Sequence, residues 1–119
     1  MGLFDWLFGP APPKIDVREA YERLQAEEPP LIVDVRQEVE TRSGVVPGAV
    51  LIPLTEFGRR YEELPRDRPI LTICRSNHRS PLAARRLATA GYEVTDVAGG
   101  LSAWEAAGLP VVKPEDTRA

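Results

Sequence analysis

Residues 69–87, PILTICRSNHRSPLAARRL, decide the fold that this sequence predicts. The stretch opens with an apolar, β-branched run at 69–74, which is typical of a strand buried on both faces. Six residues after Cys74 comes Ser80, which we expect to cap a helix whose first residue is Pro81, a favoured position for proline. A buried strand that leads through a short loop into a helix is one half of a βαβ unit.

The chain on either side repeats this alternation of strand and helix. Upstream, Asp16 is placed to cap a helix, with Glu19 in the capping-box position, and that helix should end near Glu28 because two prolines follow. Downstream, the helix that Ser80 begins should end at Gly91. On it we expect Leu82, Ala83, Leu87 and Ala88 to face inward, and Arg85 and Arg86 outward. The other expected strands are 31–35, 49–54 and 92–97. The other expected helices are 55–64 and, after a glycine turn within 99–110, a short helix that carries Trp104 and stops at Gly108.

Strands alternating with helices predict an α/β fold with a parallel sheet and helices on both of its faces. In such sheets, ligands bind at the carboxyl ends of the strands, where loops lead into helix N-termini. Cys74 is the last residue of an expected strand and Ser80 starts the next helix. A site is therefore expected between them.

Length and composition describe one small domain, which we place at residues 13–113 of a 119-residue chain. Residues 1–12 form an apolar tag or linker, in which Asp5 interrupts the run that a signal peptide would need. Packing back on the domain, contact with a membrane surface and self-contact all remain open for the tag. Residues 114–119 form a C-terminal tail. No apolar run is long enough for an integral membrane segment.

The net charge and the cysteine content exclude further classes of function. The net charge of −3 gives no electrostatic case for binding nucleic acid. A single cysteine excludes an internal disulfide and makes a reducing, cytoplasmic setting the default. One cysteine and one histidine fall short of a metal-ligand set, so neither a metal nor another cofactor is expected.

The loop from Cys74 to Arg79 has the composition of an anion cradle. A tight loop of this length can turn several backbone N–H groups toward one anion, and the following helix adds its positive end. Arg75 and Arg79 add two cations, and all these effects favour a thiolate. A buried cysteine of the kind that merely fills space is the plainer alternative. His78 is either a solvent-facing loop residue or a residue at the mouth of the site.

The stretch CRSNHRSPLAARRLATAGYEVTDVAGGLSAWEAAGLPV resembles the second half of a single-domain rhodanese, a sulfurtransferase. Upstream, LIVDVRQEVETRSGVVPGAVLIPL is similar to that family's first signature. The likeness covers roughly residues 14 to 112. It implies a three-layer domain with a mostly parallel five-stranded sheet, and transfer of sulfane sulfur through a cysteine persulfide.

The resemblance also implies roles for individual residues. Cys74 would be the nucleophile, Arg75 and Arg79 the side chains that attract an anionic donor, and residues 76–78 (Ser76, Asn77 and His78) the source of loop amides. Asp34 and Arg36 match the family's Asp-Val-Arg pair, which we take as structural support, with Ser80, for the loop. A surface ion pair is the alternative for these two residues.

Two departures from the family pattern stand out. Asn77 replaces the usual loop glycine, and a left-handed backbone is expected there if the loop shape needs one, since asparagine tolerates it best after glycine. The family's frequent histidine is absent from the Gly44–Ala49 segment, where Val45 takes its place. That departure puts a packing contact in doubt, and leaves the chemistry in place.

Three functions are compatible with this pattern. The first is a thiosulfate sulfurtransferase that passes sulfur from a small anionic donor to cyanide, a thiol or a protein acceptor. The second is a phosphatase or arsenate reductase, which would need an arginine six positions after the cysteine, where this chain has Ser80. The third is a sulfur-relay or binding module that serves a protein partner.

Overall fold

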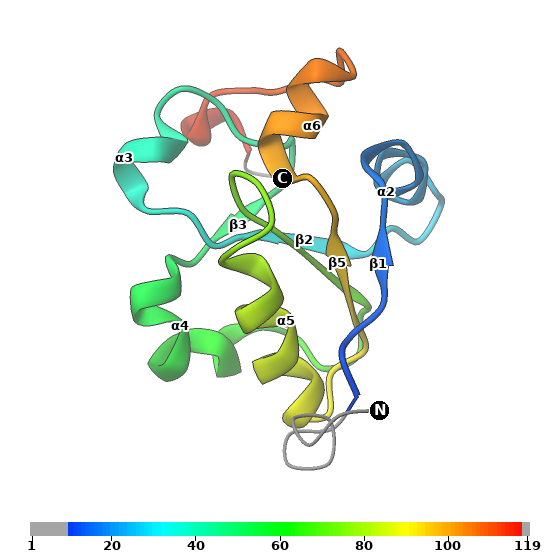
Figure 1. Ribbon diagram of the computed structural model, residues 1–119, viewed down its shortest axis with the longest axis vertical. Coiled ribbons are helices and arrows are strands. Elements are labelled where there is room, and N and C mark those ends of the chain that lie inside the picture. The colour runs from blue at the N-terminus through cyan, green and yellow to red at the C-terminus, as the bar shows by residue number, and fades with distance from the viewer. Residues whose placement is uncertain (1–9, 118–119) are drawn as a thin grey trace.

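The computed structural model describes residues 10–117 and places a five-stranded sheet at the centre of the molecule (Figure 1). The spatial order is β1-β5-β4-β2-β3, and every neighbouring pair is parallel. The strands are β1 (Lys14–Ile15), β2 (Leu31–Asp34), β3 (Val50–Leu51), β4 (Ile70–Ile73) and β5 (Val94–Val97). The helices are α2 (Val17–Leu24), α3 (Glu38–Thr41), α4 (Leu54–Arg60), α5 (Ser80–Thr89) and α6 (Gly100–Ala106), with 3-10 turns at Tyr61–Glu63 and Pro114–Asp116.

Helices cover both faces of the sheet and make the three-layer α/β domain that the sequence predicts (Figure 1). On one face, α4 and α5 enclose a core that includes Phe57, Ala83 and Leu87. On the other face, α2 and α6 enclose a second core around Trp104, whose ring meets Tyr21 edge-on. The expectation of a parallel sheet between two helical layers is confirmed.

The central strand β4 positions the candidate site. All four of its residues are buried, as is typical of a strand in the middle of a parallel sheet. Because strand side chains alternate between faces, Leu71 and Ile73 lie in the α2/α6 core, whereas Ile70 and Cys74 lie in the α4/α5 core. Cys74, the first residue after β4, therefore lies on the face that α5 covers.

Local differences from the sequence-based expectations concern short elements and helix ends. The strand β1 was not expected, because a segment of two residues is too short to show the apolar–polar alternation of a strand. It is formed by pairing with β5. Helix α2 ends at Leu24, four residues before Glu28, because the backbone turns at Gln25. On α5, Leu82 is 60% exposed, so the prediction that it faces inward is wrong; the inward stripe continues through a neighbouring alanine, Ala84, instead.

The two ends of the chain contribute little to the described structure. Most of the apolar tag, residues 1–9, lies outside the described residues, as do residues 118–119. In the C-terminal tail, the 3-10 turn at Pro114–Asp116 follows an isolated antiparallel bridge between Val45 and Val112. Within residues 10–117, no helix is long and apolar enough to cross a bilayer.

Candidate functional site

The loop that follows β4 is fastened to the first turn of α6. The backbone N–H of Leu101 donates to the carbonyl of Cys74 at 2.8 Å, and the N–H of Ser102 donates to the carbonyl of Arg75 at 2.9 Å. This contact requires Gly100, whose φ is +59° and whose position leaves no room for a Cβ beside the carbonyl oxygen of Cys74. The loop carbonyls thus satisfy the unpaired N–H groups of a helix end.

Those two hydrogen bonds determine where the loop amides point. In a trans peptide the N–H lies opposite the C=O, so the amides of Arg75 and Ser76 are directed away from α6. Among the described residues, no acceptor takes a hydrogen bond from the backbone N–H groups of residues 75–79. Cys74 is 1% exposed at the base of this loop. A run of free amides beside a buried sulfur is the arrangement that stabilises a bound anion.

Asn77 ties the tip of the loop to the same helix end. Its side-chain Oδ1 accepts a hydrogen bond from the backbone N–H of Gly99 at 2.8 Å. No residue other than glycine has a positive φ within the described part of the chain, so the expectation of a left-handed backbone at Asn77 is wrong. Asparagine is used here for its side-chain carbonyl, which a glycine at this position could not supply.

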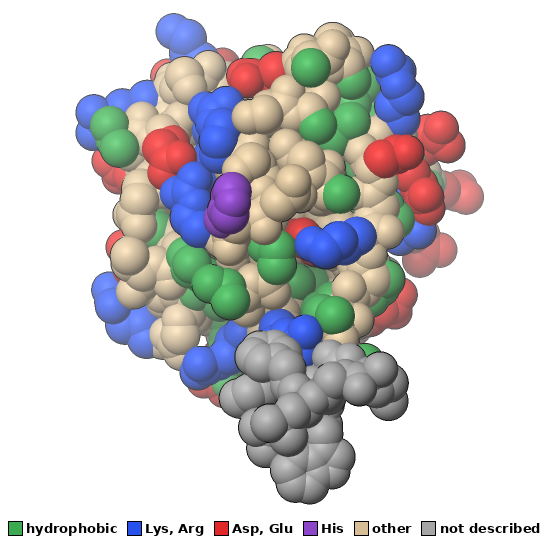
Figure 2. Space-filling model, in the orientation of Figure 1, with side chains coloured by type: hydrophobic (Ala, Val, Ile, Leu, Met, Phe, Trp, Pro, Cys, Tyr) green, Lys and Arg blue, Asp and Glu red, His purple; other side chains and the backbone are tan. Residues whose placement is uncertain are grey.

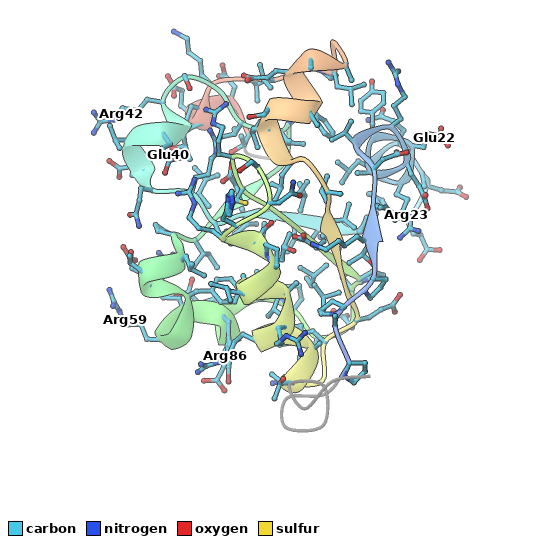
Figure 3. The ribbon with its side chains drawn as sticks, viewed as in Figure 1. Glu22, Arg23, Glu40, Arg42, Arg59 and Arg86 are labelled. Carbon is cyan, nitrogen blue, oxygen red and sulfur yellow. The ribbon has the colours of Figure 1, made fainter. Side chains whose placement is uncertain are left out.

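Both loop arginines are paired with glutamates. Arg79 makes two hydrogen bonds to Glu40, at 2.6 and 2.8 Å. Figure 3 labels Glu40 on α3. The hydrogen bonds from Arg79 lower the pKa of the Glu40 carboxyl to about 2, and the same contact raises the pKa of Arg79. Arg75 contacts Glu105 on α6 at 3.3 Å. The loop therefore carries less net positive charge than its two arginines suggest.

The Asp34–Arg36 pair holds the segment that presents Glu40. Nη2 of Arg36 lies 2.8 Å from the Asp34 carboxylate, and the two side chains are 1% and 0% exposed. The same guanidinium donates to the backbone carbonyls of Glu40, at 3.2 Å, and Gly44, at 2.8 Å. The alternative of a surface ion pair is wrong, because both charges are buried and the arginine bridges two backbone segments. Glu40 itself was not singled out from the sequence.

Ser80 does not cap α5. It is the first helical residue, Arg79 precedes it as the N-cap, and Pro81 is therefore the second residue rather than the first. The Ser80 side chain is fully buried, and its hydroxyl has no hydrogen-bond partner among the described residues. The capping prediction failed because the loop reaches α5 one residue earlier than the sequence pattern indicates.

His78 lies on the exposed surface of the loop. Its Nδ1 is 3.1 Å from the hydroxyl of Ser76, and lysine and arginine side chains gather beside it (Figure 2). A separate hollow of about 790 Å³ lies against α2 and the β2–β3 edge, and no residue of the loop lines it. The loop site is therefore distinct from that apolar hollow.

Comparison with known proteins agrees with this geometry. A family model described as the rhodanese-like domain matches residues 16–107. A protein named sulfurtransferase from Allochromatium vinosum is 38% identical over 103 residues, which cover 86% of this chain and 96% of that one. The crystal structure of a rhodanese-related protein from Thermoplasma volcanium superposes with a TM-score of 0.79 at 31% identity, covering 84% of this chain and 97% of that one.

A longer relative contains the same domain as one part. The adenylyltransferase and sulfurtransferase of Ogataea parapolymorpha is 35% identical over 91 residues, which make up 75% of this chain and 23% of that protein. The word sulfurtransferase therefore appears in the name of a relative of matching length and in the name of a larger, composite relative.

Proposed function

The chain belongs to the rhodanese-like family, and we propose that it is a sulfurtransferase that carries sulfane sulfur on Cys74. The observation that supports this most directly is the set of free amides at residues 75–79, beside a buried thiol. Burial by itself fits an inert cysteine equally well. The amides favour a functional thiol, because a run of N–H groups that no described acceptor takes is available to an anion held on the sulfur.

The proposed reaction has two covalent steps. The Cys74 thiolate attacks the outer sulfur of thiosulfate, an S–S bond to cysteine forms, and the bond between the two donor sulfurs breaks as sulfite leaves. The product is the persulfide anion, which the loop amides stabilise as an oxyanion hole would stabilise an oxygen anion. Cyanide then attacks the outer sulfur, thiocyanate leaves, and the thiolate is regenerated. Charge and atoms balance in both steps, and no cofactor takes part.

Arg75 and Arg79 play a more limited part in this proposal than the sequence suggests. Each is paired with a glutamate, so each presents a partly neutralised guanidinium beside the loop. Arg75, at 40% side-chain exposure and with one 3.3 Å contact, is the more available of the two for an arriving anion. Arg79, held by two shorter bonds, instead fixes the end of the loop against α3.

The short loop after Cys74 favours sulfur over phosphate. Six residues run from Cys74 to Arg79, and the next residue, Ser80, stands where a phosphate-binding loop of this type would carry its arginine. With Cys74 only 1% exposed, a small donor fits the approach better than a phosphorylated protein. A phosphatase or arsenate reductase is therefore the weaker proposal.

A sulfur-relay role differs only in the acceptor. The composite relative from Ogataea parapolymorpha joins a sulfurtransferase part to an adenylyltransferase part in its name, which favours a protein acceptor as the second candidate. Both versions need a free thiol, and we place the protein in a reducing compartment, the cytoplasm, for that reason.

Steady-state kinetics test the proposed reaction. Initial rates measured over a grid of thiosulfate and cyanide concentrations should give the parallel double-reciprocal lines of a ping-pong mechanism. Cys74→Ser should show no rate above the uncatalysed reaction. Intersecting lines would contradict a covalent sulfur intermediate, and a relay protein would show parallel lines with a cyanide step much slower than the step with a protein thiol.

A further inference from the structure

Ser80 is a buried hydroxyl without a partner at the end of the loop that carries Cys74. Its side chain is 0% exposed, and its Oγ makes no hydrogen bond to any described atom, the Cys74 sulfur included. Leaving a buried hydroxyl unsatisfied costs roughly 1–3 kcal/mol. Such a group in an otherwise satisfied interior suggests a ligand or a reaction intermediate that the resting protein does not hold.

The placement of Ser80 follows from the helical spacing of the buried residues of α5. The buried residues of this helix are Ser80, Ala83, Ala84 and Leu87, spaced i, i+3, i+4 and i+7, so they form one inward stripe. Ser80 is the end of that stripe nearest the loop. The stripe packs into the α4/α5 core.

Cys74 lies at the corresponding end of β4. It belongs to the same core as Ala83, Ala84 and Leu87, and α5 packs directly on β4 and β5. Ser80, the first inward residue of the helix, and Cys74, the first residue after the strand, therefore both lie at the carboxyl edge of the sheet, at the two ends of the loop.

We propose that the Ser80 hydroxyl is a catalytic hydrogen-bond donor to the sulfur that Cys74 carries in the persulfide state. The inference rests on the proposed sulfurtransferase function. A persulfide extends the cysteine by one sulfur at about 2.05 Å from Sγ. In the proposed arrangement this added sulfur lies between the strand end and the helix start. The added sulfur is anionic and accepts hydrogen bonds, so it gives the Ser80 hydroxyl the partner that the resting thiol form does not provide.

This role explains why a serine stands at a position where no cap is made. As the first residue of α5 its side chain cannot serve the helix as an N-cap does, and an alanine would fill the buried stripe as well as Ala83 does. The loop amides supply hydrogen bonds from the side of the loop, and Ser80 adds one from the side of the core. Sulfur on Cys74 would then be enclosed by donors from both directions.

The test compares Ser80→Ala with Thr89→Ala, which removes a hydroxyl from the exposed, opposite end of the same helix. Each variant and the wild type are loaded with thiosulfate and freed of donor, and the persulfide is followed by intact mass spectrometry. We expect the Ser80→Ala persulfide to decay roughly tenfold faster, the size expected for a lost hydrogen bond to a charged group. The Thr89→Ala persulfide should last as long as that of the wild type.

A second measurement separates this role from a structural one. The resting thiol form of Ser80→Ala should unfold at the same denaturant concentration as the wild type, or a higher one, since the hydroxyl has no partner to lose. Equal persulfide lifetimes in Ser80→Ala and wild type, or a clearly less stable thiol form, would overturn the assignment while leaving sulfur transfer intact. Absence of any persulfide in the wild type would overturn the proposed function and the assignment together.

Discussion

Replacing Glu40 by glutamine should destabilise the protein in a pH-dependent way. The hydrogen bonds from Arg79 lower the pKa of Glu40 from 4.5 to about 2, a shift that corresponds to roughly 3 kcal/mol if it were expressed in full. The Glu40 and Arg79 side chains are 28% and 30% exposed, and solvent screening reduces the expected contribution to about 1–1.5 kcal/mol. We therefore expect Glu40→Gln to lower the melting temperature at pH 7 by roughly 4–6 °C.

The sign of the pH dependence follows from the lowered pKa. Glu40 stays ionised in the folded protein at pH values where it is protonated in the unfolded chain. The Glu40–Arg79 pair therefore makes its full contribution to the free energy of unfolding above about pH 4.5. It is lost as the pH falls from there toward 2. The stability difference between wild type and Glu40→Gln should therefore be full at pH 7 and should shrink steadily below pH 4.5.

Denaturant unfolding at pH 7, 4 and 3 measures this difference. Glu38→Gln is the matched control, because Glu38 lies on the same short helix and contacts Arg42 at 3.3 Å with both side chains largely exposed. That variant should unfold close to the wild type at every pH. A Glu40→Gln effect that is the same at pH 7 and pH 3, or no larger than the Glu38→Gln effect, would refute the reasoning.

Three further substitutions test how the loop is held. Gly100→Ala should cost more than 1 kcal/mol and impair sulfur transfer, because its φ of +59° disfavours alanine and its Cβ would overlap the loop backbone; retained melting temperature and activity would contradict this. Arg36→Ala should cost about 3–5 kcal/mol by leaving Asp34 charged, buried and unpaired, and a small loss in denaturant unfolding would show that the pair is dispensable. Asn77→Ala should cost about 0.5–1.5 kcal/mol through the lost hydrogen bond from Gly99, whereas an unchanged unfolding midpoint would show that the side chain does not anchor the loop.

The parts of the fold that were predicted correctly are those determined by short, contiguous stretches of sequence. The strand β4 is a continuous buried run in which Thr72 is the one polar residue, and Gly108 marks the end of the α6 segment with a left-handed backbone. The strand β1 was missed because two residues against the edge of β5 show no pattern of their own. The alternation of strands and helices was sufficient to predict the layers.

The candidate site was predicted in its position but not in its contacts. The place of Cys74 followed from the strand, the short loop and the helix start. The Glu40–Arg79 contact joins residues 39 positions apart, and only the folded chain brings them together. Asn77 and Ser80 were misread for a different reason: their residue types suit several backbone roles, and the docking of the loop on α6 selects among them.

Intact mass spectrometry of the protein, after incubation with thiosulfate and removal of the donor, measures directly whether sulfur is carried on Cys74. We expect a gain of one sulfur atom that maps to the peptide containing Cys74, disappears on adding cyanide and is absent from Cys74→Ser. An unchanged mass in the wild type, or an adduct that persists in Cys74→Ser, would show that Cys74 does not carry the sulfur.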